Sequence, residues 1–311
     1  MRKINNLLLL TIALMTITSI SSQAQKVELT LNLEKGKEYR QVTNSKATII
    51  QDIYGQKMNI VMTIKGGMSY KVVSVNPSDY DLEVKYESLS MITEMAQMKM
   101  EFSSDKNDEQ DILSTLLSKM IGNTFNVKMA KNGKILEVKD IELQIESLFE
   151  DFTNIPENQL AQFKSQITEA YGAEAFKGSI QMVTAIFPDN PVNKGDKWTI
   201  KTNLESGMAL SMTTEYEFTD LGSNYAMIKG NSVIETEDKD AYIESNGMTM
   251  KYDMTGSMIS EIKVDKETGW IIEANINQEI KGDAYMKGNS QMPNGMKIPM
   301  IMNNEMTITN E

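Results

Sequence analysis

Residues 81–87, Asp-Leu-Glu-Val-Lys-Tyr-Glu, alternate charged and apolar side chains at every position. In an extended chain successive side chains point to opposite faces, so Leu82, Val84 and Tyr86 share one face. The spacing predicts a strand with that face buried and the charged face in water. This segment favours a mainly β protein built on antiparallel sheet.

The sequence on the C-terminal side extends the pattern. Residues 125–129 alternate in the same way, and Asn132-Gly133 is typical of a tight hairpin turn. Between the two strand segments, residues 108–120 carry apolar side chains at helical spacing and predict one helix. Those side chains belong to Ile112, Leu113, Leu116, Leu117 and Met120.

The second half of the chain repeats the plan of the first. Three segments of the first half have counterparts in the same order: 36–39 with 195–198, 70–80 with 216–225, and 127–136 with 264–271. The offsets shrink from 159 through 146 to 137, as insertions in the first copy would make them. We therefore expect a diverged tandem duplication.

Residues 141–186 join the two halves and have helical periodicity. Apolar positions fall on one face between Ile141 and Phe152, and again between Leu160 and Tyr171, where Gly172 is a natural stop. A third, weaker helix is expected at 173–184. Such amphipathic faces must be buried, and the open face of a sheet is the obvious partner.

These patterns define the expected fold class and domains. We expect a mainly β (α+β) protein with two similar curved antiparallel sheets or half-barrels and a helical segment between and packed against them. The expected divisions are a signal peptide at 1–24, a first β-rich repeat at 25–140, a helical connector at 141–186 and a second β-rich repeat at 187–311.

The first 24 residues predict export. Arg2 and Lys3 precede an apolar stretch of 14 residues, and Ser22-Gln23-Ala24 is a small-x-small cleavage site. A spanning helix needs roughly 20 residues, so a cleaved signal peptide is favoured over an anchor. Cleavage is expected after Ala24. The chain has no cysteine to carry a lipid, and a lipoprotein is not expected. The predicted location is the periplasm, the cell surface or the medium.

Composition excludes several classes of function. The formal charge is −12, and loss of the two basic residues of the signal peptide makes it −14. Such a chain repels nucleic acid and anionic membranes. The absence of histidine and cysteine rules out the Ser-His-Asp, Cys-His and His-metal mechanisms. We expect no cofactor and no conventional enzyme.

Residues 187–198, Phe-Pro-Asp-Asn-Pro-Val-Asn-Lys-Gly-Asp-Lys-Trp, are the most distinctive run in the chain. With the helices before it and the strands after it, this Pro-Val-x-x-Gly-Asp-x-Trp junction resembles uncharacterised secreted proteins of Bacteroidota, grouped in a domain-of-unknown-function family. The resemblance covers most of the chain after residue 24. It implies no activity and assigns no site residues.

Methionine is the one compositional excess, with 25 in 311 residues. It clusters at 95–100, 248–254 and 296–302. The pattern allows three interpretations: the apolar face of strands, an adaptable hydrophobic surface, and a Cu(I) site of thioethers. We favour them in that order and leave the metal ligands unknown.

Other chemical signals are weak. Ser103 and Lys106 satisfy Ser-x-x-Lys without its companion motifs. Asp105, Asn107 and Glu109 resemble a calcium loop that lacks its glycine, and the acidic run at 235–240 is typical of a solvated turn. No catalytic or cofactor-binding residue is predicted.

The expected function is binding of a hydrophobic small molecule or an envelope protein on the concave face of a curved sheet. The alternative is an acidic scaffold or assembly partner without a cavity. A carboxylate-dependent hydrolase is a distant third.

Overall fold

The computed structural model describes residues 26–310, apart from 107–110, 151, 153–155, 205–207, 246–247 and 289–291. Over these residues, 13 strands form one antiparallel sheet in the order β6-β5-β3-β2-β1-β13-β12-β11-β9-β8-β7, with β4 paired to β3 and β10 to β11. The strands are β1 (Glu38–Ile53), β2 (Gln56–Val75), β3 (Asp79–Met95), β4 (Met98–Ser103), β5 (Thr124–Ala130), β6 (Ile135–Lys139), β7 (Lys197–Leu204), β8 (Leu210–Leu221), β9 (Tyr225–Thr236), β10 (Ile243–Ser245), β11 (Met248–Asp265), β12 (Ile271–Met286) and β13 (Met296–Thr309).

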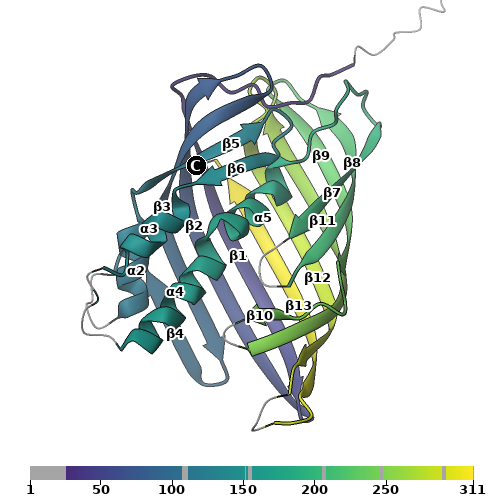
Figure 1. The fold of residues 1–311 in the computed structure, drawn as a ribbon. Helices are drawn as coiled ribbons and strands as arrows, with labels where there is room; N and C mark the ends of the chain where they lie inside the picture. The colour runs from purple at the N-terminus through teal and green to yellow at the C-terminus, as the bar shows by residue number, and fades with distance from the viewer. Residues whose placement is uncertain are drawn as a thin grey trace, which may run out of the picture.

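The sheet curls into a trough that holds the helices on its concave side (Figure 1). These are α2 (Ile112–Met120), α3 (Ile141–Ser147), α4 (Glu157–Tyr171) and α5 (Ala173–Thr184). Helix α5 packs against both β6 and β7, the two edge strands of the sheet. It therefore closes the gap between the edges at one end of the trough.

The mainly β class is confirmed, and the strands of the two predicted halves join in a single sheet. The helical segment at 141–186 contains α3, α4 and α5. The helix expected at 108–120 is observed from Ile112, where the Asp111 side chain accepts a hydrogen bond from the Ser114 N–H at 3.1 Å. Residues 107–110 of that prediction lie outside the described residues.

The two halves share their hydrogen bonding as well as their sequence pattern. The Gly36 N–H donates to the Val72 carbonyl at 2.8 Å, and the Gly195 N–H donates to the Phe218 carbonyl at 2.7 Å. Both glycines have positive φ, 83° and 90°. The following turns match too, with Asn76 bonded to Asp79 and Gly222 to Tyr225. We propose that two tandem copies of one unit build the sheet, with β13 between them.

The N-terminal segment, residues 27–33, ties the two halves together at the covered end. Val27 pairs with Val192, the Leu31 N–H donates to the Lys131 carbonyl at 2.8 Å, and the Asn32 N–H donates to the Thr268 carbonyl at 2.8 Å. Lys131 and Thr268 belong to the hairpin turns that correspond in the two halves. This end of the trough therefore has a continuous core.

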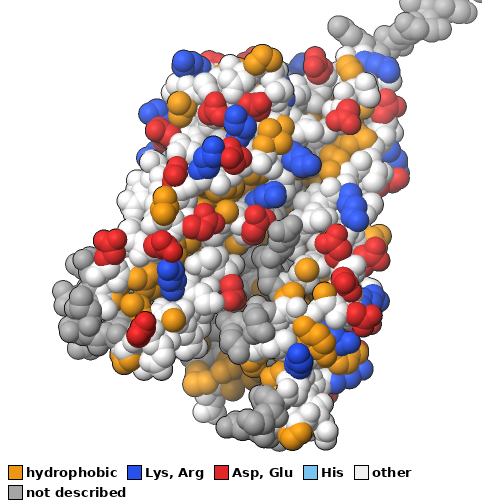
Figure 2. Space-filling view, in the orientation of Figure 1, with side chains coloured by type: hydrophobic (Ala, Val, Ile, Leu, Met, Phe, Trp, Pro, Cys, Tyr) orange, Lys and Arg blue, Asp and Glu red, His pale blue; other side chains and the backbone are white. Residues whose placement is uncertain are grey.

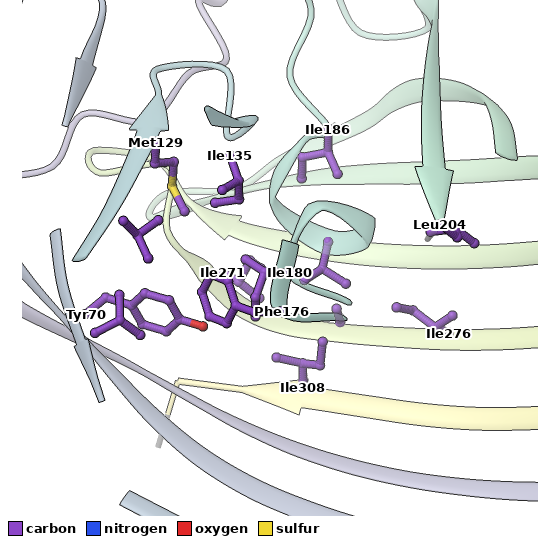
Figure 3. Packing of buried hydrophobic residues seen from close by; sticks show 14 of the residues in the cluster. Tyr70, Met129, Ile135, Phe176, Ile180, Ile186, Leu204, Ile271, Ile276 and Ile308 are labelled. Atoms are coloured by element: carbon purple, nitrogen blue, oxygen red, sulfur yellow. The ribbon is translucent and has the colours of Figure 1, made fainter. Parts of the chain in front are cut away.

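The core lies between α5 and the sheet. Figure 3 shows Phe176 and Ile180 of α5 directed toward Ile276 of β12 and Ile308 of β13. All four side chains are buried, with exposed fractions between 1% for Ile276 and 7% for Ile180.

Candidate functional site: an uncharged concave face

The contacts of α5 identify the concave face of every strand. Because side chains alternate between the two faces of a sheet, the even positions of β12 and β13 share the face of Ile276 and Ile308. The cross-strand register extends that face, since Ile276 lies opposite Met306, Met306 opposite Ser45, and Ser45 opposite Ile64. The inward positions of the neighbouring strands follow in the same way.

This face is uncharged. Among the described residues, no strand position that shares it is an Asp, Glu, Lys or Arg, although 24% of the chain is charged. The ion pairs lie on the convex side, such as Lys229 with Glu261 at 2.6 Å and Lys197 with Glu215 at 2.7 Å. Packing of a hydrophobic core requires an uncharged face only where helices cover the sheet. This face is uncharged over its whole length, so core packing does not account for all of it.

The tyrosines of the concave face also stay neutral. Burial raises the pKa of Tyr70 well above its ordinary value, and burial raises the pKa of Tyr216 to about 12. Tyr86 has a raised pKa for the same reason. The face therefore acquires no charge from these groups at physiological pH.

The concave face has two parts. The covered half lies under the helices and residues 27–33, and its side chains, such as Tyr70, Phe125 and Ile308, are 2% exposed or less. The open half is formed by the other ends of the strands, and Figure 1 shows no helix in front of β1, β13 and β12 there. Its Ile49, Met302 and Met306 are only partly buried, and Met98 and Met100 are 56% and 43% exposed. On the β11–β12 side of the same half, Met254, Met258 and Ile280 are buried, so the exposed apolar surface is centred on β1 and β13.

Methionines dominate the open half. The three clusters of the sequence, in β3–β4, β11 and β13, all face it. The inward methionines of the open half are Met58, Met62, Met91, Met95, Met98, Met100, Met248, Met250, Met254, Met258, Met286, Met296, Met300, Met302 and Met306. They spread over six strands, and this distribution favours an apolar surface.

One row of methionines bears on the Cu(I) interpretation. Met250, Met286 and Met296 lie directly opposite one another on β11, β12 and β13. Three thioethers on adjacent strands are a geometry that a soft ion tolerates. The row is nonetheless one of several that contain methionine, so it does not stand out as a separate site.

Two hollows accompany the face. A cavity of about 230 Å³ opens beside Ile243 and Tyr252 at the margin of the open half, with Met208 on its lining and the carboxylates of Glu237 and Asp238 at its charged side. Figure 2 shows the molecule hollowed between the helical side and these strands.

A larger groove of about 670 Å³ lies between α5 and the edge strand β7, where the inward-facing Trp198 and Ile200 form part of its lining. Lys134, Lys177, Lys201 and Glu237 line it. Its charged lining suits water better than an apolar molecule, and we assign the site to the concave face instead.

The weak motifs of the sequence do not assemble into a site. The Lys106 ammonium donates to the backbone carbonyl of Glu101 at 2.6 Å, not to the Ser103 hydroxyl. In the acidic run, the Asp238 carboxylate accepts the backbone N–H groups of its own turn. Asn107 and Glu109 lie outside the described residues. Among the residues that are described, no three Asp or Glu side chains gather in a group that could hold a metal ion.

Sequence reasoning found the methionine clusters but missed their neighbours. Ser45, Gln278 and Asn304 belong to the same face, and period-two alternation from Met302 and Met306 would have placed Asn304 there. For Ser45 and Gln278 no signal existed before the register was known.

The fold and the site together define a class: a single-sheet β trough with internal helices and an uncharged concave face that is half covered. The chain belongs to the family described as Family of unknown function (DUF6263), whose model matches residues 77–271. A search among curated proteins gives no match.

Three solved structures give weaker likenesses. Lipovitellin, described for its lipid–protein interactions, has a TM-score of 0.49 at 8% identity; the match covers 90% of this chain and 25% of that one. The COG4313 outer membrane channel from Pseudomonas putida F1 has a TM-score of 0.23 at 9% identity, covering 90% and 97%. An outer membrane lipoprotein-sorting protein domain from Vibrio parahaemolyticus has a TM-score of 0.13 at 7% identity, covering 85% and 83%. We argue nothing about function from such distant likenesses.

Proposed function

We propose that the protein binds a hydrophobic molecule on the open half of its concave face and carries or holds it in the bacterial envelope. The observation that supports this proposal is the uncharged open half, where apolar side chains remain partly exposed in a chain of net charge −12. Exposed contiguous apolar surface on a soluble protein marks a binding site more often than a structural accident. An apolar ligand would complete the core that the helices leave unfinished.

The methionines suit this role. Their side chains are unbranched and flexible, so they repack around ligands of different shape at little cost. Removing apolar area from water contributes roughly 25 cal/mol per Å², so a ligand that covers about 300 Å² of the face gains about 7 kcal/mol before its entropy losses. Micromolar binding requires about 8 kcal/mol net, so a ligand bound that tightly has to cover more than about 300 Å² of the face. A preformed face, such as this sheet, keeps the entropy losses small.

The envelope location rests on the sequence. The signal peptide at 1–24 supports export, although these residues lie outside the described part of the chain. Among the described residues, none of the helices has the length and hydropathy needed to cross a membrane.

The alternative, an acidic assembly partner, draws on the convex face, where charged side chains dominate. A concave face that is buried over its whole length would favour this alternative. The partly exposed Ile49, Met302 and Met306 favour the binding protein instead.

A matched pair of variants tests the proposal. Met302→Lys places a charge on the open half, whereas Ile301→Lys places the same charge on the convex face of the same strand, where Ile301 is 41% exposed. An unpaired charge in an apolar site is costly. Met302→Lys is therefore expected to weaken binding of a neutral fluorescent probe, N-phenyl-1-naphthylamine, at least tenfold, while Ile301→Lys leaves it unchanged. Equal effects of the two variants would contradict the proposal.

Native mass spectrometry of protein purified from its own host gives an independent readout. The expected result is an added mass that is released on denaturation and identified as a lipid or another apolar molecule. Release of a polypeptide instead would favour the protein-partner alternative.

A further inference from the structure

The open half contains one pair of directly opposed amides near its centre. Gln278 of β12 lies directly opposite Asn304 of β13, and Asn304 lies opposite Ala47 of β1. The same row continues to Met258 on one side and to Met62 on the other. Two residues with carboxamide side chains thus stand side by side with apolar residues on both flanks, and the Cβ atoms of directly opposed residues are about 5 Å apart.

The orientation of one amide is fixed by a neighbour. The Ser45 hydroxyl donates to Oδ1 of Asn304 at 2.7 Å. This bond occupies the carbonyl side of the amide, so the Nδ2 group of Asn304 remains as a donor. No hydrogen bond joins Asn304 or Gln278 to another described side chain, and both residues are partly buried.

A ligand that covers this row has to provide hydrogen-bonding partners for its two amides. A purely apolar ligand would strip water from two amides and leave them unpaired, at a cost of about 1–3 kcal/mol each. A ligand with a charged group would meet no opposite charge, because the described inward positions of the face are uncharged. The complementary group is therefore uncharged, accepts hydrogen bonds and has apolar arms on either side.

We propose that Asn304 and Gln278, with Ser45 orienting Asn304, form a subsite for the carbonyl of a neutral acyl ester or acyl amide, so that the ligand is a neutral lipid and not a free fatty acid. The inference rests on the proposed function and narrows its ligand class. The acyl arms extend along the methionines on either side of the row, Met302 and Met306 on β13 and Met62 on β2.

The test uses three unbranched probes of similar length: methyl decanoate, decanoate ion and undecane, each competed at pH 8 against N-phenyl-1-naphthylamine. The wild-type protein is expected to bind methyl decanoate at least tenfold more tightly than decanoate. In Asn304→Leu and Gln278→Leu, affinity for the ester is expected to fall about tenfold, while affinity for undecane is unchanged or rises.

Met302→Leu is the matched control, since it lies on the same strand and face and removes no hydrogen-bonding group. It is expected to leave the ester-to-alkane ratio within about twofold of the wild-type ratio. Urea midpoints of all three variants verify that they fold.

The outcomes separate the two proposals. If undecane and the ester both bind but their ratio is the same in wild type and in both leucine variants, the subsite is wrong and the apolar site stands. If decanoate binds as tightly as its ester, the neutral-lipid class is wrong. If none of the three probes binds the wild-type protein, the proposed function itself fails.

Discussion

The covered and open halves of one concave face differ in what completes them. In the covered half, α5 fills the trough with branched and aromatic side chains, and Phe176 meets Phe125 edge-to-face at 5.0 Å between ring centroids. In the open half β1, β12 and β13 present flexible methionines and a pair of directly opposed amides, and the helix α2 packs only at the margin, against β3 and β4. Rigid side chains suit packing against a helix of the same chain, which is always present. Flexible side chains suit a ligand that binds and dissociates. Under the proposed function, stability and binding belong to separate ends of the sheet.

The largest expected effect separates the halves by stability. Phe176→Ala removes a 2% exposed ring from the covered half and is expected to lower the free energy of unfolding by about 3–5 kcal/mol. Met302→Ala, in the open half, is expected to lower it by less than about 2 kcal/mol because its side chain is only partly buried. Urea denaturation of both variants checks the pair. Equal losses would mean that the open half is an ordinary core.

The next effect concerns alkaline pH. Burial raises the pKa of Tyr216 from 10.0 to about 12, so the folded protein keeps this proton longer than the unfolded chain. Its contribution to stability is complete below pH 10 and is lost as the pH rises through 12, at about 1.4 kcal/mol per pH unit. Tyr216→Phe is expected to flatten this part of the stability profile between pH 10 and 12, measured by urea titration. A profile identical to wild type would contradict the assignment.

A third effect tests how the covered end is sealed. The N–H of Ile135, on the edge strand β6, donates to Oε1 of Gln181 in α5 at 3.0 Å. Gln181→Leu leaves this buried donor unpaired and is expected to cost about 1–3 kcal/mol. Faster hydrogen exchange at the Ile135 amide, with binding of the apolar probe unchanged, is the expected signature. Weaker probe binding without a stability change would mean that the two ends are not separate.

The smallest effect concerns the methionines themselves. Met306→Ile exchanges a flexible side chain for a stiff one of similar volume, so stability is expected to change by less than about 1.5 kcal/mol. The range of ligand shapes that bind is expected to narrow, seen as a larger spread of affinities across straight-chain, branched and cyclic apolar probes. An unchanged spread of affinities would show that the flexibility of the Met306 side chain does not contribute to the binding of differently shaped ligands.

Much of the fold follows from local patterns in the sequence. The alternation at 81–87 lies within β3, the helix at 173–184 has the predicted limits, and the Asn132-Gly133 turn joins β5 to β6. Helix α4 ends before Gly172 as expected, whereas α3 ends at Ser147, short of the Phe152 to which the periodicity extends. Local periodicity dictates such elements because each must bury one face. The joining of both halves in one sheet could not be read from the sequence, because it depends on the pairing of β1 with β13, from Val42 with Thr309 to Gln51 with Met300.

The site shows the same limit. The methionine clusters were visible in the sequence, but their common face was not, because a shift of one residue in register would move every side chain to the opposite face. Asn303 and Asn304 illustrate this: only the pairing with β12 and β1 identifies Asn304 as the inward residue. The amide pair becomes a feature only once Gln278 and Asn304 are opposite each other.

The most direct test of the account is to locate a bound ligand. A methyl ester of an acyl chain that carries a photoreactive diazirine would be cross-linked to the protein, and the adducts mapped by mass spectrometry of its peptides. The account predicts adducts on inward residues of the open half, above all Met62, Met302 and Met306, and their loss in Met302→Lys. Adducts concentrated in the charged groove at Lys177 and Lys201, or on the convex face at Ile301, would contradict it.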